Sequence, residues 1–364
     1  MSGSASRQAY LDRVRGLAVL VMIEAHVLDG WTRLSDRNTN SFGYAMILGG
    51  FGAPLFLFLA GVSLVLSAES KCRRTGDFEG SWRAVQKRGW QIFGLAFLFR
   101  LQSFILTGGY SLIGLLKVDI LNVMGPAIAF AGVLGGRVRT RNGRAVLFGV
   151  TAASVAMLTP IVRIMPPLDW VPDPLGWYLR PSPTRANFTL FPWAGFVFAG
   201  AVVGVVIDGV RNSERVIRAQ MALAAVSALV MVAAYEASFL PSIYATSEFW
   251  TSSPTFFFLR VGLISLLLPL AFLWDLAPWR GMLGRWSPIE EFGRSSLFVY
   301  WIHVEMVYGF ISRPLRRNLS FHAAIAADLL FSTFLLALVV LKNRRLTIPK
   351  ADIVSVTGPT PSSI

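Results

Sequence analysis

The sequence predicts an all-α fold, a polytopic membrane bundle of about ten transmembrane helices, and three observations carry this prediction. Of the 364 residues, 54% are hydrophobic and only 15% are charged, against about 25% charged in ordinary soluble domains. Several apolar stretches reach the ~20 residues that a helix needs to cross the hydrocarbon layer of a bilayer. The basic residues gather in alternate loops rather than in one patch.

About ten apolar stretches are long enough to be spans. They cover residues 14–33, 44–67, 88–107, 118–135, 145–162, 190–209, 216–240, 255–276, 295–312 and 322–341. The seventh and tenth are the clearest. The ninth is the least clear, because it contains His303 and Glu305. We therefore expect lipid to be the main surroundings of this chain.

The distribution of charge predicts the orientation. The chain has 34 Lys and Arg against 20 Asp and Glu, a formal charge of +14. If the N-terminus is cytoplasmic, most of the basic residues fall in the cytoplasmic loops and tails, so the positive-inside rule predicts an N-in, C-in protein with an even number of spans. The basic excess thus orients the chain and does not indicate binding to nucleic acid. Glu24 and His26 interrupt the first apolar run, which we interpret as an uncleaved span rather than a signal peptide.

We expect one domain. Connections are short apart from an inner loop at 68–87 and an outer loop at 163–189, so residues 1–345 form a single transmembrane domain and 346–364 a disordered cytoplasmic tail. The outer loop is rich in proline and aromatic residues, and it is either a lid over an outward-facing pocket or a plain connector. Small residues indicate close helix contacts. They include Gly61, Gly200 and Gly204.

Several site classes lose support. The single cysteine, Cys72, lies in a predicted cytoplasmic loop, which argues against a disulfide framework and a cysteine-based metal site. The sequence has no P-loop, no nucleotide-binding glycine fingerprint, no nucleophile elbow and no HExxH motif. We predict no metal site.

His26 lies inside the first span, where an ionisable group is costly and usually marks a functional path. At 100° per residue, Arg15 and His26 share a helix face, with Asp29 nearby, while Glu24 points elsewhere. About 16 Å of rise separates Arg15, at the cytoplasmic mouth, from His26. This face is the first candidate site.

A second histidine, His303, lies in the ninth span. Ser296, Tyr300 and His303 follow one helix face at i, i+4 and i+7. A lone buried histidine is more often structural, but here two spans each carry one, with carboxylates close by. His322, at the outer interface, is expected to be solvated. A histidine poised by a carboxylate suits a general base or an acyl acceptor, and equally a proton-coupled carrier.

Further polar residues lie at comparable depth. Asp119 and Asn122 share a face in the outer half of the fourth span, and Arg100 and Arg260 lie in the outer halves of the third and eighth. Asp119 is either part of the catalytic machinery or the partner of Arg100 or Arg260 in a structural ion pair. Trp193, in the sequence Phe-Pro-Trp, either walls the pocket or is an ordinary interface aromatic.

These residues, in this order, resemble the heparan-alpha-glucosaminide N-acetyltransferase catalytic-domain family, which includes YeiB-like polytopic membrane acyltransferases. The resemblance covers nearly the whole chain. It is carried by residues 11–16 (LDRVRG), 51–61 (FGAPLFLFLAG), 119–122 (DILN), 191–193 (FPW) and 296–303 (SLFVYWIH). It implies transfer of an acetyl group from cytoplasmic acetyl-CoA to an amino sugar or similar acceptor outside; heparan sulphate itself is not implied.

One departure from the family pattern concerns the histidine. In the family the first helix ends in an asparagine and the proposed catalytic histidine follows about three turns later. Here His26 stands at the asparagine-like position, and residues 29–33 contain no second histidine. Either His26 does the work of that histidine from a shifted place, or the chain uses another acceptor or chemistry.

The first hypothesis is therefore a membrane acetyltransferase. Arg15, Lys87 and Arg88 are candidates for the CoA phosphates, although Lys87 and Arg88 also suit plain positive-inside anchoring. One imidazole acts as base or accepts the acetyl group, with Asp29 or Asp119 orienting it. The predicted acceptor-binding residues are Asn122, Trp193, Tyr300 and Arg260.

The second hypothesis is a proton-coupled transporter of a sugar or anionic solute, which would use the same buried groups. The absence of an obvious inverted repeat counts modestly against it. A scaffold in an envelope-polysaccharide complex is a third option. In each case we expect an integral protein of a bacterial-type cytoplasmic membrane, in contact with lipid and open to homo-oligomer formation.

Overall fold

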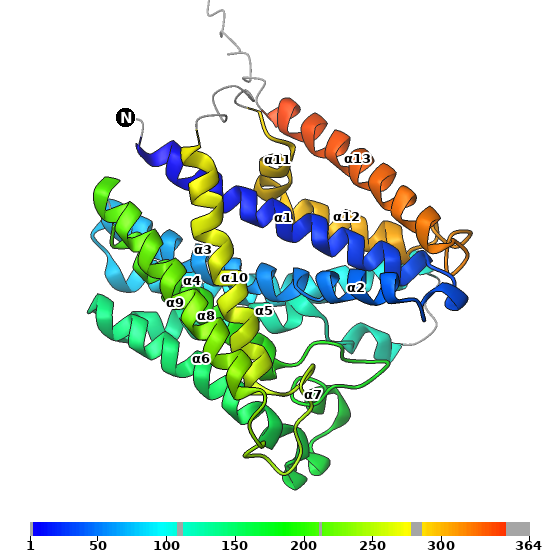
Figure 1. The fold of residues 1–364 in the computed structure, drawn as a ribbon, viewed down its shortest axis with the longest axis horizontal. Coiled ribbons are helices and arrows are strands. Elements are labelled where there is room, and N and C mark those ends of the chain that lie inside the picture. Colours follow the sequence, from blue (N-terminus) through cyan, green and yellow to red (C-terminus); the bar gives the residue numbers. More distant parts are fainter. Residues whose placement is uncertain (1–2, 108–111, 211–212, 278–285, 347–364) are drawn as a thin grey trace, which may run out of the picture.

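The computed structural model describes residues 3–107, 112–210, 213–277 and 286–346, and in this part of the chain the fold is all-helical (Figure 1). The long helices are α1 (Gly3–Trp31), α3 (Gly52–Thr75), α4 (Phe78–Thr107), α5 (Ile120–Arg137), α6 (Arg141–Ile164), α8 (Leu190–Asp208), α9 (Ser213–Ala237), α10 (Pro254–Leu276), α12 (Ser296–Tyr308) and α13 (Phe321–Leu346). Shorter elements are α2 (Asn40–Gly49), α7 (Asp173–Gly176), α11 (Pro288–Arg294) and the 3-10 turns η1 (Leu34–Asp36), η2 (Leu112–Leu116) and η3 (Pro166–Trp170).

The prediction of an all-α polytopic membrane bundle is confirmed. A helix lies at every predicted span, and 7 helical segments are long and apolar enough to cross a membrane by themselves. They are Asn40–Thr75, Ile120–Arg137, Arg141–Ile164, Leu190–Asp208, Glu214–Ala237, Pro254–Leu276 and Phe321–Arg344. The count of about ten spans and the N-in orientation stay predictions.

Two spans differ from their predicted form. The stretch 44–67 is two helices, because α2 ends at Gly49 and α3 begins at Gly52, and the bend at Gly49 packs against Ala25 of α1. The ninth span, predicted to end at residue 312, ends at Tyr308 before Gly309. Helix α12 therefore has only 13 residues, which is about 20 Å of helix against a hydrocarbon layer of ~30 Å.

Close helix packing follows the small residues. Helix α3 packs on α8, α4 on α5 and α9 on α10. At the α3–α8 crossing, a Cβ atom on Gly200 would overlap the carbonyl of Phe58, and one on Gly61 would overlap the carbonyl of Val197. Only glycine lets these two backbones touch, as the sequence predicted.

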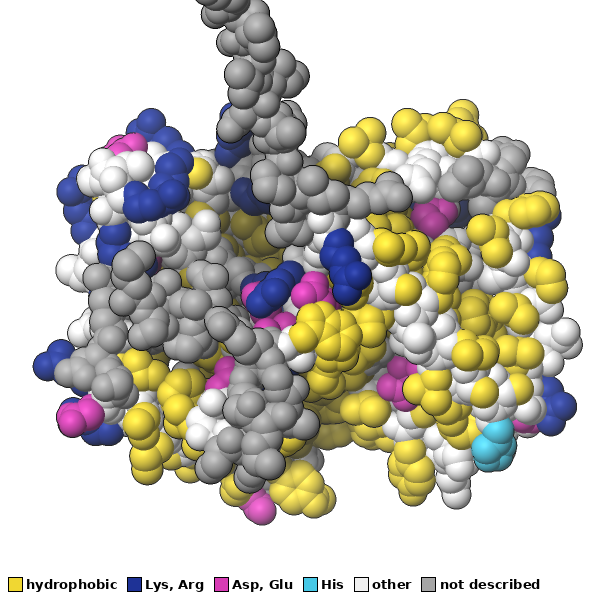
Figure 2. All heavy atoms as spheres, turned by 90° about the horizontal axis from the view of Figure 1, so that it is seen from above, with side chains coloured by type: hydrophobic (Ala, Val, Ile, Leu, Met, Phe, Trp, Pro, Cys, Tyr) yellow, Lys and Arg dark blue, Asp and Glu magenta, His cyan; other side chains and the backbone are white. Residues whose placement is uncertain are grey.

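The outermost helices show an apolar surface. Only 11% of the most apolar window of α9, and 22% of that of α13, is buried inside the protein. Helices that are apolar all round are stable only when buried or in lipid, so these faces contact the bilayer. Viewed from above, charged side chains gather near the middle of the face and at its upper left, and apolar side chains cover much of its right-hand half (Figure 2).

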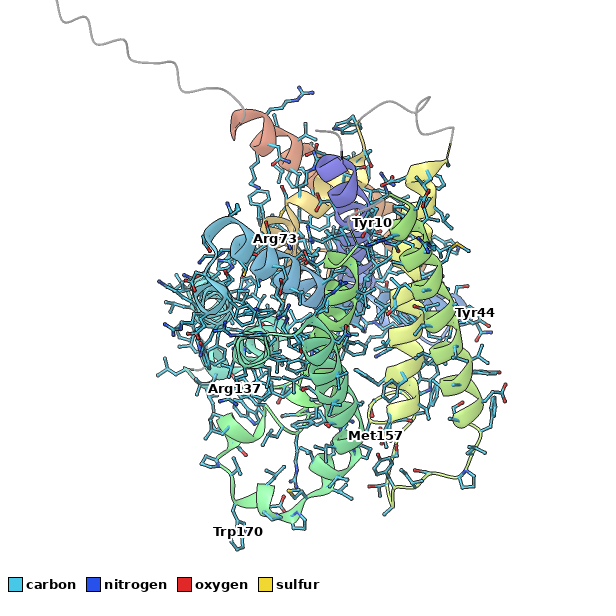
Figure 3. All side chains as sticks on the ribbon, turned by 90° about the vertical axis from the view of Figure 1, so that its left-hand side faces the viewer. Tyr10, Tyr44, Arg73, Arg137, Met157 and Trp170 are labelled. Atoms are coloured by element: carbon cyan, nitrogen blue, oxygen red, sulfur yellow. The ribbon has the colours of Figure 1, made fainter. Side chains whose placement is uncertain are left out.

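The outer loop folds back onto the bundle. It contains η3 and α7, and Trp170 lies at the end of the molecule opposite Tyr10 and Arg73 (Figure 3). The amide of Val118 donates to the carbonyl of Arg185 at 2.9 Å, which fixes the loop against the start of α5. Whether the loop is a lid stays open. The predicted disordered tail, 346–364, lies outside the described residues except for Leu346.

Candidate active site

The two histidines that the sequence singled out meet. Nδ1 of His26 on α1 lies 2.9 Å from Nε2 of His303 on α12, and the two rings are nearly parallel, with an interplanar angle of 13°. Nδ1 of His303 lies 2.8 Å from the carbonyl oxygen of Val299, one turn earlier. His303 is fully buried, whereas His26 is partly exposed. His322, as predicted, is exposed.

Asp29 does not contact either imidazole. Its carboxylate is paired with Arg37 at 3.3 Å, accepts a hydrogen bond from the Tyr308 hydroxyl at 3.4 Å, and is 49% exposed. Three residues beyond His26, it is turned from the histidine by about 60°, toward the loop after α1. Tyr308 links the two groups, because its ring lies edge-on to His26 with centroids 5.5 Å apart.

Asp119 forms the ion pair that was one of the two alternatives predicted for it. It pairs with Arg100 of α4 at 2.7 Å, and it is the N-cap of α5, in a capping box with Asn122. The amide of Asn122 donates to the hydroxyl of Tyr178, in the outer loop, at 3.4 Å. Burial raises the pKa of Tyr178, so this hydroxyl is neutral. Asp119 makes no hydrogen bond to either histidine.

Tyr300 occupies the centre of the site. It is buried, and its ring lies 5.8 Å from His303, 6.2 Å from Phe56 on α3 and 6.0 Å from Phe99 on α4, centroid to centroid. Its hydroxyl has no hydrogen-bond partner among the described residues. Tyr300 therefore joins the histidine pair to the aromatic lining of α3 and α4.

Two other predicted residues lie in aromatic clusters. The guanidinium of Arg260 stacks on the ring of Phe256 at 3.9 Å and makes no ion pair in the described part of the chain. The ring of Trp193 lies 4.7 Å from that of Phe188 and 6.1 Å from that of Phe196. No contact joins either residue to the histidines, so their role in binding an acceptor stays a prediction.

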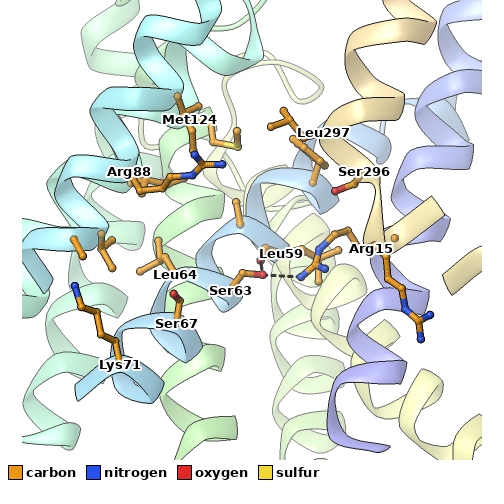
Figure 4. A pocket seen from close by; sticks show the side chains of 18 of the residues that line it. Arg15, Leu59, Ser63, Leu64, Ser67, Lys71, Arg88, Met124, Ser296 and Leu297 are labelled. Carbon is orange, nitrogen blue, oxygen red and sulfur yellow. Dashed lines mark hydrogen bonds between the residues drawn. The ribbon is translucent and has the colours of Figure 1, made fainter. Parts of the chain in front are cut away.

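A cavity of about 380 Å³ opens beside α1, α3, α4 and α5, on the side predicted to be cytoplasmic (Figure 4). Four cations and four serine hydroxyls line it: Arg15, Lys71, Arg88, Arg294, Ser63, Ser67, Ser81 and Ser296. Apolar side chains, among them Phe56, Met124 and Leu297, form the rest of the wall.

The cations of this cavity differ in their partners. Arg15 is held by Asp12 at 2.6 Å and by the Ser63 hydroxyl at 2.9 Å, and Arg294 lies 3.5 Å from Glu290. Arg88 has no carboxylate partner among the described residues, and Lys71 has only a carbonyl at 3.5 Å. Of the predicted phosphate ligands, Arg15 and Arg88 line the cavity and Lys87 does not.

Sequence reasoning missed Lys71 and Arg294. The signal for Lys71 was present, since Ser63, Ser67 and Lys71 recur every fourth residue and so face one side of α3. Arg294 ends a short helix that was not predicted. The inner end of the cavity, at Phe56 and Leu297, adjoins Tyr300 and so leads toward His303.

The comparison with known families shows which family the chain belongs to. A family model described as heparan-alpha-glucosaminide N-acetyltransferase, catalytic, matches residues 7–239. The chain belongs to this N-acetyltransferase family. Among curated proteins, none matches its sequence. This family member is a membrane protein whose family activity is acetyl transfer. His26 lies within the matched residues, whereas His303 and Tyr300 lie beyond them.

Proposed function

We propose that this protein transfers an acetyl group across the membrane, from cytoplasmic acetyl-CoA to an amino sugar or other saccharide acceptor on the opposite side. The observation that carries the proposal is the continuous line of contacts from the cationic cavity through Phe56 and Tyr300 to the histidine pair. One end of this line suits a phosphorylated donor, and the other holds a group able to move a proton.

The cavity residues fit CoA. Guanidinium groups bind phosphate through paired hydrogen bonds, and ammonium groups bind it as point charges. Among the residues that the structure describes, no carboxylate neutralises Arg88 or Lys71, so they are available to an anion. The serines would donate to phosphate or amide oxygens, and the apolar wall would hold the pantetheine arm. Acetyl-CoA supplies the acetyl group as a thioester.

The histidine pair supports the chemical step. A neutral imidazole can take the proton of an attacking amine or hydroxyl, or can itself accept the acetyl group. Tyr300 is buried, and its hydroxyl, which has no partner among the described residues, is a donor for the oxygen of the thioester carbonyl when negative charge develops on it.

The acceptor would approach from the outer side. Asn122, at the start of α5, and Tyr178, in the outer loop, place an amide and a phenol side by side, and aromatic and amide groups of this kind bind sugars. Lys117, at the same place, is half-buried, and burial together with the nearby Arg100 lowers its pKa. Arg260 and Trp193 would form the outer wall in this arrangement.

The test uses purified protein in lipid nanodiscs with acetyl-CoA labelled in the acetyl group and glucosamine as acceptor. We expect release of CoA together with labelled N-acetylglucosamine. Movement of the sugar into proteoliposomes without CoA release would support a proton-coupled transporter instead. Hydrolysis of acetyl-CoA without an acetylated product would show that glucosamine is the wrong acceptor while leaving the donor assignment intact.

A further inference from the structure

We propose that Nε2 of His26 is the atom that takes the proton or the acetyl group, and that His303 is a positioning residue that fixes the tautomer of His26. The inference rests on the proposed function, but the positions of the protons on the two imidazoles can be measured without turnover. His303 lies outside the residues that match the family model. The family-model match therefore assigns it no role.

The argument starts at Val299. A carbonyl oxygen only accepts hydrogen bonds, so Nδ1 of His303, 2.8 Å away, must carry a hydrogen. A neutral imidazole has one N–H, and Nε2 of His303 is therefore a bare acceptor. Nδ1 of His26 lies 2.9 Å from that acceptor and must donate to it. The only nitrogen left with a free lone pair is Nε2 of His26.

Burial supports the neutral state of His303. Its side chain is fully buried, and a buried cation without a counterion is strongly unfavourable. The ionisable groups around the pair are Asp29, Tyr300 and Tyr308. None of them forms a hydrogen bond with His303, and the carboxylate of Asp29 is turned to Arg37.

The two imidazole rings differ in their accessibility. Both nitrogens of His303 are engaged and its side chain is inaccessible. His26 is partly exposed. Its Nε2 has no hydrogen-bond partner among the described residues and is not a buried atom. A substrate can therefore reach Nε2 of His26 and no other nitrogen of the pair.

The assignment gives a balanced step. As the acceptor amine attacks the thioester carbon, its proton moves to Nε2 of His26, the C–N bond forms, the C–S bond breaks, and the thiolate then takes the proton from Nε2. While His26 is an imidazolium, its Nδ1–H donates to His303, which stabilises the charge. If His26 accepts the acetyl group instead, Nε2 forms the C–N bond, the C–S bond breaks and CoA leaves as its thiolate, while Nδ1–H of the acetyl-imidazolium still donates to His303. The acceptor amine then attacks the acetyl carbon, the C–N bond to Nε2 breaks, and the proton of the amine passes to the thiolate.

The direct test is nitrogen NMR of protein labelled with 15N-histidine in nanodiscs. The chain has only 3 histidines, and His322→Gln removes the exposed one, which assigns the spectrum. We expect both His26 and His303 to carry their proton on Nδ1, although Nε2–H is the usual form of free histidine. A proton on Nε2 of His26 in the resting protein would overturn the proposal.

The second test compares two replacements of His303. His303→Gln keeps an acceptor within reach of His26, and His303→Leu removes it. We expect His303→Gln to retain kcat within about tenfold and His303→Leu to lose about 100-fold or more, since loss of the residue that orients a catalytic imidazole costs up to ~10⁴. Equal loss in both variants, with melting temperatures unchanged, would contradict a positioning role.

The two proposals fail differently. If wild-type protein releases no CoA with any acceptor but His26 and His303 both carry their proton on Nδ1, the proposed function is wrong and the proton arrangement stands. If wild-type protein is active but His303→Leu is fully active too, the function stands and the role of His303 is wrong. His322→Gln is the matched control, and we expect it to leave kcat unchanged.

Discussion

The cationic cavity and the histidine pair are built in opposite ways. In the cavity, Lys71 and Arg88 are long side chains without carboxylate partners in the described part of the chain, at the end of the protein where cations are abundant. In the histidine pair, two short side chains are fixed by a hydrogen bond of 2.9 Å between helices distant in sequence and by one of 2.8 Å to the backbone within α12. The first arrangement suits capture of a charged donor, and the second suits chemistry that depends on exact geometry. We therefore expect changes in the cavity to alter KM and changes in the pair to alter kcat.

Replacing His26 should have the largest effect. His26→Gln keeps a polar group of similar size but removes the basic nitrogen, and we expect kcat to fall about 10³-fold, within the ~10²–10⁴ that general acid–base groups contribute. Steady-state release of CoA measures this. A fall in kcat/KM that arises only from KM would show that His26 binds substrate and does no chemistry.

The Arg100–Asp119 pair tests the structural side of the comparison. Both side chains are largely buried, at 19% and 13% exposure, so Asp119→Ala leaves a cation unpaired and also removes the cap of α5. We expect the free energy of unfolding to fall by about 3 kcal/mol. Denaturation in detergent measures it. An unchanged stability with a large loss of kcat would return Asp119 to the catalytic residues.

Arg88 and Lys87 form a matched pair for the cavity. They are neighbours on α4 and both are exposed, but only Arg88 lines the cavity. We expect Arg88→Ala to raise KM for acetyl-CoA about tenfold with kcat unchanged, a loss of ~1.4 kcal/mol of binding. Lys87→Ala should change neither constant. Equal effects of the two variants would indicate general surface charge rather than a specific site.

The smallest effect concerns Asp36, outside the spans. Hydrogen bonds from the side chain of Arg33 and the backbone amide of Phe321 lower its pKa to about 2. A carboxyl whose pKa is lowered by folding stabilises the folded state above its unfolded pKa of ~3.9, and loses that contribution as the pH falls through 2. We expect Asp36→Asn to lower the melting temperature at pH 6 and to make little difference near pH 2. A gap that persists at pH 2 would contradict this.

The sequence predicted the components of the site better than their contacts. Helical periodicity placed Arg15 and His26 on one face and Tyr300 and His303 on another, and the structure brings these faces together. Periodicity could not identify the partner of Asp119, because the choice between Arg100 and Arg260 depends on which helices are neighbours. The same limit applies to Asp29, whose direction is set by Arg37 in a loop, and to Lys87 and Arg88, which one residue turns apart by ~100°.

Two predicted helix boundaries were wrong because a helix ends at or before a glycine although the apolar run continues. The bend between α2 and α3 follows Gly49, and α12 ends before Gly309. Apolar side chains continue past both points, so composition alone extends each span. The cavity is partly lined by α11, a short helix whose seven residues gave no periodic signal.

In the proposed function, the shortness of α12 bears on how two reactants on opposite sides of the membrane can meet. A helix of 13 residues is roughly one third shorter than the oil layer around it. In the proposed reaction, a wall element this short leaves less low-dielectric material between water-soluble molecules that enter from the two sides. The aromatic contact of Phe56 with Tyr300 would then separate the two sides and prevent a leak.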